Sequence, residues 1–592
     1  MSPSVPNVSP SGRRATPLSA IVLACVLCGA AVVVPVYGSA YSIQFATDII
    51  QAVILAYSWN LLAGYTGYLS FGHVAFFGIG AYATAMLVMY TPVPWYVSVF
   101  IGGAAAVAVA VLVGPIMLRL RGILFALGML GLARIMETIF TDWQFPGGAA
   151  GTVISGELTP VAVYGLMLFT GAAAFAANLF IVKSGFGLDA MSVREDEDAA
   201  LAMGVPTNRV KTLVFALSAL FPAIAGGLVA WNRSYIDPPS AFDPTMDLLT
   251  IVFVLFGGIG TLWGPLIGAS VLMAVAEVLL VKVPAIKLAL YGLIVIGVVL
   301  RLPGGMVSLI NRLGGHLVRK PVLVPDAFPS DIEGLMPSGA VGGGVPDDAS
   351  AGERVPVLQV RDVTVRFGGH VAVDKVSFDV GEGEILCVIG ANGAGKTTLF
   401  NAITGAVPTT EGWISLFGKD ITAVPLYGRV HMGIARTFQI PRLLGDLTVW
   451  ENVLVAARHG RQAHRAVEYS ASVMRILGLE SLKLERAGML SPGRQRELEI
   501  ARVLAVQPDV VLLDEVMAGM TRDEQETVRN VIRRFPELGV HAVICVEHVI
   551  AAVADLSDRM LVLDFGRKIA HDVPDKVLND PAVVRSYLGD VA

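Results

Sequence analysis

Ten apolar stretches in the first half of the chain constrain its fold more than any other feature. Each is about long enough to cross a bilayer as a helix, which takes roughly 20 apolar residues. The stretches are 17–38, 42–63, 70–90, 95–118, 122–140, 159–182, 211–231, 247–263, 264–281 and 286–302. We therefore predict an all-helical membrane domain of about ten transmembrane helices. If residues 247–281 formed one long span instead of two, the domain would have nine spans, and the second half of the chain would lie on the other side of the membrane.

Charged residues are distributed unevenly along the chain. Roughly 27 fall in the first 315 positions and about 64 in the remainder, so the two halves face different solvents. We predict a tail at 1–16, a membrane domain at 17–315, a flexible Pro- and Gly-rich linker at 316–355 and a water-exposed domain at 356–592. The net charge of -5 without a basic stripe excludes nucleic-acid binding.

The basic residues of the loops predict the orientation in the membrane. With the N-terminus in the cytoplasm, Arg119, Arg121, Lys183 and Arg194 lie in cytoplasmic loops, and loop 141–160, which has no Lys or Arg, lies outside. Ten spans then return the second domain to the cytoplasm. The basic N-terminal segment also fits a signal peptide, but the length of the apolar stretch after it favours an uncleaved span.

Two stretches of the membrane domain place glycines between aromatic residues. They are GYTGYLSFGHVAFFGIGAYA (64–83) and FGGIGTLWGPLIGA (256–269). Small residues let helix backbones approach closely, so tight helix packing is one interpretation and unwound backbone along a substrate path is the other. His73 lies in the first stretch, either as a ligand contact or as a structural hydrogen-bonding residue.

The four cysteines predict neither a disulfide framework nor a metal site. Cys25 and Cys28 have a spacing that can hold a metal, but they share one apolar helix and lack a second pair. Cys387 and Cys545 lie in apolar stretches of the second domain. We interpret all four as structural.

A charged segment, VREDEDAALAMGV (193–205), interrupts the apolar pattern. Its charged residues are Arg194, Glu195, Asp196, Glu197 and Asp198. They lead into an Ala-rich run of high helix propensity. The segment is either a solvated loop helix or a docking helix for a cytoplasmic partner, and the second domain of the same chain offers such a partner.

The second domain contains a phosphate-binding loop. After the apolar strand EILCVI comes GANGAGKTT (390–398), a full match to G-x-x-x-x-G-K-[ST] at a strand-to-helix junction. Its glycines let backbone N–H groups wrap phosphates, Lys396 reaches the β- and γ-phosphates, and the Thr397 hydroxyl can coordinate Mg²⁺. ATP and Mg²⁺ are the predicted cofactors.

Three further segments carry groups that ATP hydrolysis requires. VVLLDEV (510–516) is typical of a buried strand and ends in Asp514, suited to the metal ion, and Glu515, suited to polarising the attacking water. RTFQI supplies Gln439 as a metal and water contact, and AVICVEH ends in His548, which can contact the γ-phosphate. The order of these segments along the chain is stronger evidence for ATP hydrolysis than any one of them alone.

Together with LSPGRQRELEIAR (490–502), these segments resemble the nucleotide-binding domain of an ABC transporter over residues 356–592. The resemblance implies an α/β P-loop NTPase fold of ABC type with a helical subdomain. It assigns nucleotide binding to Asn392, Gly393, Ala394, Gly395, Lys396, Thr397 and Thr398, and adenine stacking to Phe367. It assigns Gln439 to the Q-loop, Asp514 to the Walker B motif, Glu515 to the catalytic base and His548 to the switch.

LSPGRQRELEIAR corresponds to the family's signature motif, which contacts the phosphate on the opposite ATPase domain of a dimer. Its helix start attracts anions, with Arg494 and Arg496 beside it. Ser491 and Gly493 supply a hydroxyl and a close backbone approach, and Arg494 replaces the usual glutamine. Because one chain makes only half of each nucleotide site, the resemblance implies a second permease and ATPase, LivH-like and LivF-like, or a homodimer.

More narrowly, VRFGG, LTVWENVLVAA and RELEIARVLA are similar to the LivG-type ATPase of branched-chain amino acid importers. LRLRG, VREDEDAALAMGV and the glycine-rich stretches are similar to the LivM-type permease over about residues 40–310. The chain thus resembles a fusion of two normally separate subunits, with the family's coupling helix at 193–205. Val516, Thr521-Arg522 and Val549 depart from the family pattern without removing a catalytic group.

The resemblance implies ATP-driven import of branched-chain or related amino acids across a bacterial cytoplasmic membrane, with an extracytoplasmic binding protein that captures the cargo. Urea and short-chain amide importers are similar and stay an alternative, because no residue distinguishes an isobutyl side chain from a urea group. A half-transporter exporter shares the domain order, but it would have six spans and long cytoplasmic helical extensions.

Overall fold

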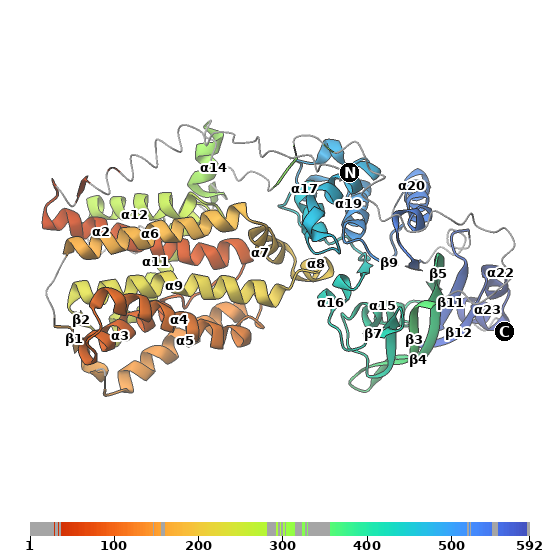
Figure 1. Cartoon of the computed structure of the whole chain (residues 1–592), viewed down its shortest axis with the longest axis horizontal. Coiled ribbons are helices and arrows are strands. Elements are labelled where there is room, and N and C mark those ends of the chain that lie inside the picture. Colours follow the sequence, from red (N-terminus) through yellow and green to blue (C-terminus); the bar gives the residue numbers. More distant parts are fainter. Residues whose placement is uncertain are drawn as a thin grey trace, which may run out of the picture. The chain divides into compact units, whose positions relative to one another are not determined.

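The computed structural model describes most of both domains. The described residues are 37–145, 147–155, 160–280, 304–313, 356–517, 520, 522–547 and 555–588, with isolated positions within 29–34, 292–301 and 323–328. The chain forms two compact units (Figure 1). The helical unit comprises residues 1–190 and 208–320, and the sheet unit comprises residues 191–207 and 321–592. The charged segment near residue 195 therefore belongs to the same unit as the second domain.

Helices of four to 27 residues make up most of the helical unit (Figure 1). They are α2 (Ala40–Trp59), α3 (Val74–Tyr90), α4 (Trp95–Met117), α5 (Ile123–Asp142), α6 (Pro160–Lys183), α9 (Thr207–Arg233), α10 (Pro238–Ala241), α11 (Pro244–Gly257), α12 (Gly264–Leu280) and α14 (Gly305–Arg312), with α7 (Gly185–Glu195) continuing into the sheet unit. A two-stranded pairing joins β1 (Thr152–Val153) to β2 (Tyr235–Ile236). The prediction of an all-helical membrane domain is confirmed.

The number of membrane spans is only partly settled by these helices. Within the described residues, six helical segments are long and apolar enough to cross a bilayer, and α3 and α12 are apolar but shorter. These eight correspond to eight of the ten predicted windows. The windows at 17–38 and 286–302 fall largely outside the described residues, so the count of ten is not confirmed.

The glycine-rich stretches pack closely, as one interpretation predicts, and each contains non-helical backbone, at 67–73 and 258–263, as the other predicts. A Cβ at Gly80 of α3 would collide with the backbone of Ala223 in α9. The second stretch breaks between α11 and α12, and Asn60, in the π-helix Asn60–Gly64, holds this break. The Asn60 amide donates to Asn178 Oδ1 (3.1 Å) and to the Thr261 carbonyl (3.3 Å), and its Oδ1 accepts from the Gly260 N–H (2.8 Å). Residues 247–280 thus form two helices rather than one.

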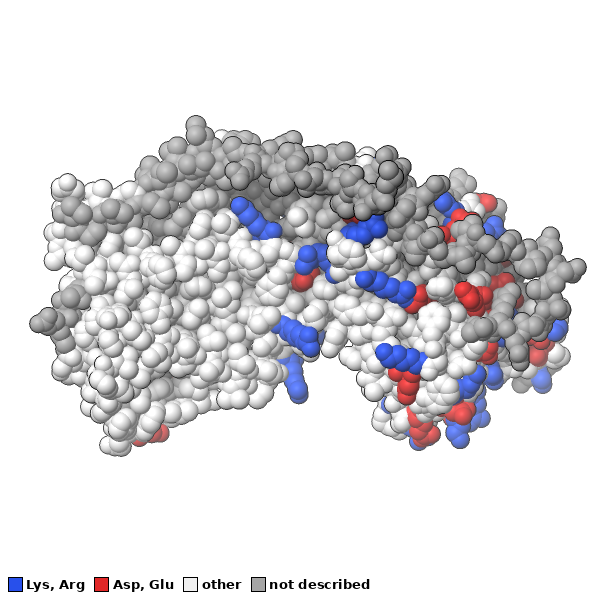
Figure 2. Space-filling model, in the orientation of Figure 1, with Lys and Arg blue, Asp and Glu red and all other residues white. Residues whose placement is uncertain are grey.

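Charge distinguishes the surfaces of the two units. On the face shown in Figure 2 the helical unit is almost entirely uncharged, apart from a few basic side chains at one end and a small acidic group at the other, whereas acidic and basic side chains cover much of the sheet unit. This pattern agrees with the uneven charge of the sequence and with a helical unit that faces lipid.

Two sheets organise the sheet unit. One has six strands in the order β12-β11-β5-β10-β9-β8, and the other has four in the order β4-β3-β6-β7. The strands are β3 (Pro356–Phe367), β4 (His370–Gly381), β5 (Glu384–Ile389), β6 (Glu411–Leu416), β7 (Lys419–Asp420), β8 (Ile434–Arg436), β9 (Val510–Asp514), β10 (Ala542–Val546), β11 (Arg559–Asp564) and β12 (Arg567–Asp572). In the first sheet all neighbours pair in parallel except β12 with β11. An α/β fold is therefore confirmed.

Helices and a continuous apolar core complete the sheet unit. The helices are α8 (Glu197–Ala202), α15 (Lys396–Thr404), α16 (Leu426–His431), α17 (Val449–Arg458), α18 (Ala466–Ile476), α19 (Pro492–Ala505), α20 (Arg522–Arg533), α22 (Pro574–Leu578) and α23 (Pro581–Leu588). Fully buried side chains such as Val360, Leu386, Phe400 and Ile414 join α15 to both sheets. Because a packed core resists distortion, it holds the strand ends, where the polar site residues lie, in fixed positions.

Part of the predicted linker contacts the sheet unit. The Phe328 ring lies edge-on to Trp450 of α17, with a centroid distance of 6.0 Å, and the Lys483 ammonium lies 5.0 Å from its centroid. The Phe328 carbonyl also accepts from Arg475 (3.3 Å). The linker thus meets the domain that follows it at Phe328; most of its other residues, and the tail at 1–16, fall outside the described part of the chain.

Candidate active site

The phosphate-binding loop joins β5 to α15 at the carboxyl edge of the parallel strands. Because β5 pairs with β10, and β10 with β9, the loop and the end of β9 meet at this edge. Gly395 adopts φ +97°, and a Cβ there would also collide with the Ala372 carbonyl of β4. Only glycine suits this position, because its missing side chain permits both the backbone angle and the close approach.

Lys396 lies inside this loop. Its ammonium donates to the carbonyls of Gly390 (2.7 Å) and Ala391 (3.0 Å). Burial lowers the pKa of Lys396, and the carboxylates of Glu515 and Asp514 act in the opposite direction. Phosphate oxygens stabilise the charged form of a lysine and so offset the loss of its contact with water. The Lys396 amine therefore fits a nucleotide phosphate.

The loop is open to a ligand beside that lysine. Asn392, Gly393 and Thr397 are exposed, whereas Ala394 is buried and Thr398 is half-buried. The N-terminus of α15, which begins at Lys396, is directed to the same loop and favours anions. The residues at this junction therefore have the arrangement that binds phosphates.

The acidic pair follows β9 as predicted. Asp514 is buried at the strand end, where its N–H donates to Thr437 Oγ1 (2.9 Å) and Arg436 lies 3.9 Å from its carboxylate. Burial raises the pKa of Asp514, and Arg436 opposes that effect. Glu515 is half-buried with φ +49°, and its Oε2 accepts from the Gln439 amide (2.9 Å). The structure thus brings together the predicted Q-loop residue and the predicted base.

Arg496 has a role that the sequence interpretation missed. It lies beside the start of α19, which favours an anion contact, but it is buried and points inward. Its guanidinium donates to the Phe438 carbonyl (2.8 Å) and to Glu499 Oε2 (2.8 Å), and Glu499 Oε1 accepts from the Phe438 N–H (2.7 Å). The pair holds the segment that carries Gln439. Arg496 and Glu499 are opposite charges at i and i+3, and this spacing is the sequence signal that could have predicted the pair.

The start of α19 itself is available to a ligand. Ser491 occupies the N-cap position and is exposed, and its side chain makes no capping hydrogen bond. Gly493 is half-exposed in the first turn, and Arg494 pairs with Glu497 at 2.6 Å. The helix start and the Ser491 hydroxyl can therefore both contact an anion.

Phe367 ends β3 at the tip of the β3–β4 hairpin. It is 52% exposed and pairs with His370 across the turn. The hairpin leads into β4, whose Ala372 carbonyl lies against Gly395 of the phosphate-binding loop. An exposed aromatic ring on the strand pair next to this loop can stack on a nucleotide base.

The charged segment packs on the sheet unit through Arg442, which the sequence interpretation did not single out. Its guanidinium lies 2.8 Å from the Asp198 carboxylate and 3.5 Å from that of Asp196. Arg442 follows the Q-loop residue Gln439 by three positions, and its carbonyl accepts from Arg502 of α19. One arginine therefore connects the segment to the loop beside the acidic pair.

A second set of contacts surrounds Asp446. Its N–H donates to Glu195 Oε2 (3.0 Å), and Arg194 lies 3.6 Å from its carboxylate. Glu197 instead accepts from the Thr207 hydroxyl at the start of α9 (3.3 Å). The segment is thus a docked element of the sheet unit, and Arg194, Glu195, Asp196 and Asp198 make the contacts.

Several predicted residues are not placed by the structure. His548, Thr521 and Val549 lie outside the described residues, as do Cys25 and Cys28. Val516 is buried after the acidic pair, and Cys387 and Cys545 are buried free thiols in neighbouring strands, as expected of structural residues.

Comparisons with known proteins match both units. The model of the family described as "Branched-chain amino acid transport system / permease component" matches residues 41–299. The ABC transporter model matches 373–518, and that of the "Branched-chain amino acid ATP-binding cassette transporter" matches 567–592.

Individual relatives cover the second half of the chain. The high-affinity branched-chain amino acid transport ATP-binding protein BraF of Pseudomonas aeruginosa is 35% identical over 251 residues, which are 40% of this chain and 98% of the relative. LivG of Escherichia coli K12 is 34% identical over the same shares. A crystal structure of an ATP-binding cassette of an ABC transporter in its ADP conformation is 31% identical, covers 40% of this chain and 99% of its own, and has a TM-score of 0.36. The chain belongs to the branched-chain amino acid ABC transporter family, with a permease domain and an ATP-hydrolysing domain in one polypeptide.

Proposed function

We propose that this chain is the fused permease and ATPase subunit of an importer for branched-chain amino acids in a bacterial cytoplasmic membrane. The observation that carries the proposal is that both units, matched separately, point to the same transport system. The agreement also argues against the exporter, which needs no branched-chain permease.

ATP binds where the loop, the acidic pair and Phe367 converge. The loop residues Asn392 to Thr398 hold the phosphates, and Phe367 stacks on adenine. Thr397, Asp514 and Gln439 hold Mg²⁺, which neutralises phosphate charge. Glu515 polarises the attacking water, and His548 contacts the γ-phosphate.

The open start of α19 supports a second ATPase domain as a partner. Ser491 and Gly493 contact the phosphate bound by the partner domain, and this chain's loop receives the partner's equivalent helix. The partner is a LivH-like permease with a LivF-like ATPase, or a second copy of this chain. An extracytoplasmic binding protein delivers the cargo.

Residues 193–205 transmit the ATPase cycle to the permease. Their contacts with Arg442 and Asp446 support this role, since Arg442 lies three residues after Gln439, which itself contacts Glu515. A movement at the acidic pair therefore has a short path to the segment.

Reconstitution in liposomes tests the proposal. The complex of this chain with its partner subunits and binding protein should take up labelled leucine only with ATP inside. The K396A complex, identical except for the lysine of the phosphate-binding loop, should take up none. Uptake of urea or acetamide in place of leucine would assign the chain to the related amide importers and contradict the proposed cargo.

A further inference from the structure

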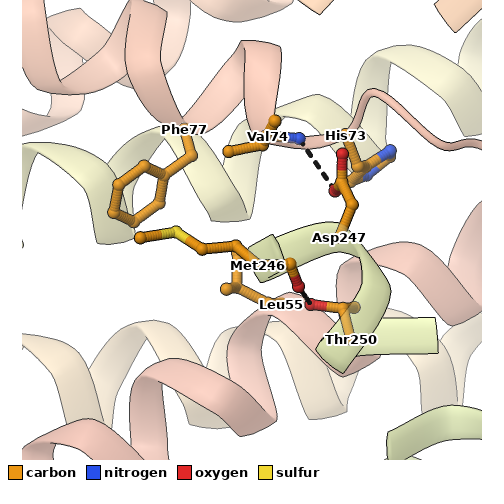
Figure 3. Close-up of a pocket in the computed structure, with 7 residues that line it drawn as sticks. All are labelled: Leu55, His73, Val74, Phe77, Met246, Asp247 and Thr250. Carbon is orange, nitrogen blue, oxygen red and sulfur yellow. Dashed lines mark hydrogen bonds between the residues drawn. The ribbon is translucent and has the colours of Figure 1, made fainter. Parts of the chain in front are cut away.

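A small pocket with a mixed lining lies within the helical unit (Figure 3). Its volume is about 10 Å³, which is room for a group the size of one water molecule. Leu55 of α2, Phe77 of α3 and Met246 of α11 supply apolar walls. Figure 3 shows His73 and Asp247 together on the side opposite Phe77.

Asp247, which lines this pocket, keeps one carboxyl oxygen without a hydrogen-bond partner among the described residues. The side chain is 4% exposed, and its Oδ1 accepts from the Val74 N–H at the start of α3 (3.0 Å). A helix start stabilises a negative charge, so the carboxylate is held in position and electrostatically supported. The backbone N–H of His73 also interacts with this carboxyl group. Among the described residues, Asp247 Oδ2 itself has no hydrogen-bond partner. A buried carboxylate oxygen without a donor is costly and calls for a partner.

His73 presents a second unused acceptor. Its Nε2 lies 2.9 Å from Ser58 Oγ and 3.2 Å from the Ser218 carbonyl. Because the Ser58 hydroxyl donates its proton to the Ser218 carbonyl, Nε2 must carry a proton to satisfy these contacts. Nδ1 is then a bare acceptor, and it is buried without a hydrogen-bond partner among the described residues. The sequence left two roles open for His73, a ligand contact or a structural residue. Its Nε2 suits the structural role, and its Nδ1 suits the ligand contact.

The remaining polar group of the lining does not supply a donor. The Thr250 hydroxyl donates to the Met246 carbonyl (2.7 Å) within α11. The pocket is therefore lined by aliphatic and aromatic side chains together with Asp247 and His73, each of which keeps one acceptor atom without a hydrogen-bond partner among the described residues. A matching ligand group has several N–H donors and a positive charge, and it is about as large as a water molecule.

We propose that Asp247 and His73 bind the α-ammonium group of an aliphatic amino acid as it crosses the helical unit. A primary ammonium has three donors, enough for Asp247 Oδ2 and His73 Nδ1. Leu55, Phe77 and Met246 then face the aliphatic side chain of the cargo. The present volume holds the ammonium group alone, so the pocket widens when a whole amino acid binds. The inference rests on the proposed import of amino acids and adds where the permease recognises them.

Substitution of the carboxylate tests the site. In liposomes that contain the complete transporter and its binding protein, D247N should lower the initial rate of leucine uptake by about tenfold or more, because the amide lacks the charge that pairs with the ammonium. Binding of ATP by the sheet unit should be unchanged. The matched control is D243N on the same helix. Asp243 caps α11 by accepting from the Thr245 N–H (2.9 Å), lies outside the pocket lining, and can be replaced by asparagine as a cap.

The outcomes separate this site from the proposed function. If the wild-type complex takes up leucine and D247N does so at the rate of D243N, the ammonium site is wrong while the import function stands. If the wild type takes up no leucine, the import function itself fails.

A measurement on the wild-type chain covers the case in which D247N does not assemble. A hydrophobic carbodiimide modifies carboxyl groups in membrane interiors, and mass spectrometry reads the modified Asp247 peptide. Leucine supplied during ATP-driven turnover should slow the labelling of Asp247. Equal labelling with and without leucine would overturn the proposal.

Discussion

Reversing the charge of Arg442 should separate ATP hydrolysis from transport. Arg442 is the residue through which the sheet unit holds both Asp196 and Asp198, at 3.5 and 2.8 Å. The substitution R442E replaces these two attractions with repulsion, and it leaves the phosphate-binding loop and the acidic pair intact. The segment 193–205 should therefore dock poorly while the nucleotide site stays complete.

The size of the effect follows from the exposure of the groups. The Arg442 side chain is 43% exposed, and those of Asp198 and Asp196 are 47% and 26% exposed. Exposed ion pairs contribute about 0.2–1 kcal/mol each, and like charges at the same positions cost similar amounts. Two pairs reversed together therefore weaken docking by about 1–3 kcal/mol, or roughly 5- to 150-fold. Because salt screens exposed charges, the loss should shrink at high ionic strength.

The assay is the number of leucine molecules transported per ATP hydrolysed in proteoliposomes. R442E should lower this ratio and keep substantial ATPase activity, and D198R in the same chain should restore part of it by reversing the pair. The matched control is R465E, since Arg465 forms an equally exposed pair with Glu468 (2.7 Å) and has no partner in the segment. The reasoning is refuted if R442E and R465E have the same ratio, or if D198R gives no recovery.

Four further substitutions test the other assignments. K396A should abolish equilibrium ATP binding, and retained binding would remove the lysine from the phosphate site. E515Q should bind ATP but hydrolyse it about 100-fold or more slowly and persist as a closed ATPase dimer in size-exclusion chromatography; normal turnover would exclude Glu515 as the base. F367A should raise the Kd for ATP about 2- to 12-fold, and an unchanged Kd would leave the ring as a surface residue. N60A removes three hydrogen bonds of a buried side chain, two of them to the α11–α12 break and one to Asn178 of α6. It should destabilise the purified protein by about 2–4 kcal/mol and lower its melting temperature, and an unaltered melting curve would contradict this.

The nucleotide site was accessible to sequence reasoning because its groups are local. Lys396 follows its strand within a continuous motif, and Asp514 ends a strand that the apolar run VVLLD identifies. Each such residue takes its position from a few neighbours, and parallel pairing then brings the strand ends to one edge. Gln439 and Glu515 meet there at 2.9 Å, 76 positions apart, as their shared chemistry predicts.

Pairs joined across long distances in sequence were not accessible in the same way. Arg442 contacts Asp198 from 244 positions away, and Asp247 contacts the Val74 N–H from 173 positions away. Neither residue belongs to a motif, and each lies among neighbours that give no indication of a partner. Arg496 appeared to be an anion ligand from its place at a helix start, but burial directs it to Glu499 and the Phe438 carbonyl.

By itself the sequence determined that this protein has an apolar helical half and an ATPase half, because hydropathy and contiguous motifs depend only on residues that are neighbours in the sequence. It left open whether the segment 193–205 is solvated or docked, and whether His73 is structural or a ligand contact. Only the tertiary structure decided that the segment docks on the sheet unit and that His73 and Asp247 share a pocket. The physical reason is that the effect of a charge or a hydrogen-bond acceptor depends on the groups within a few ångströms of it. The fold brings those groups together from any part of the chain.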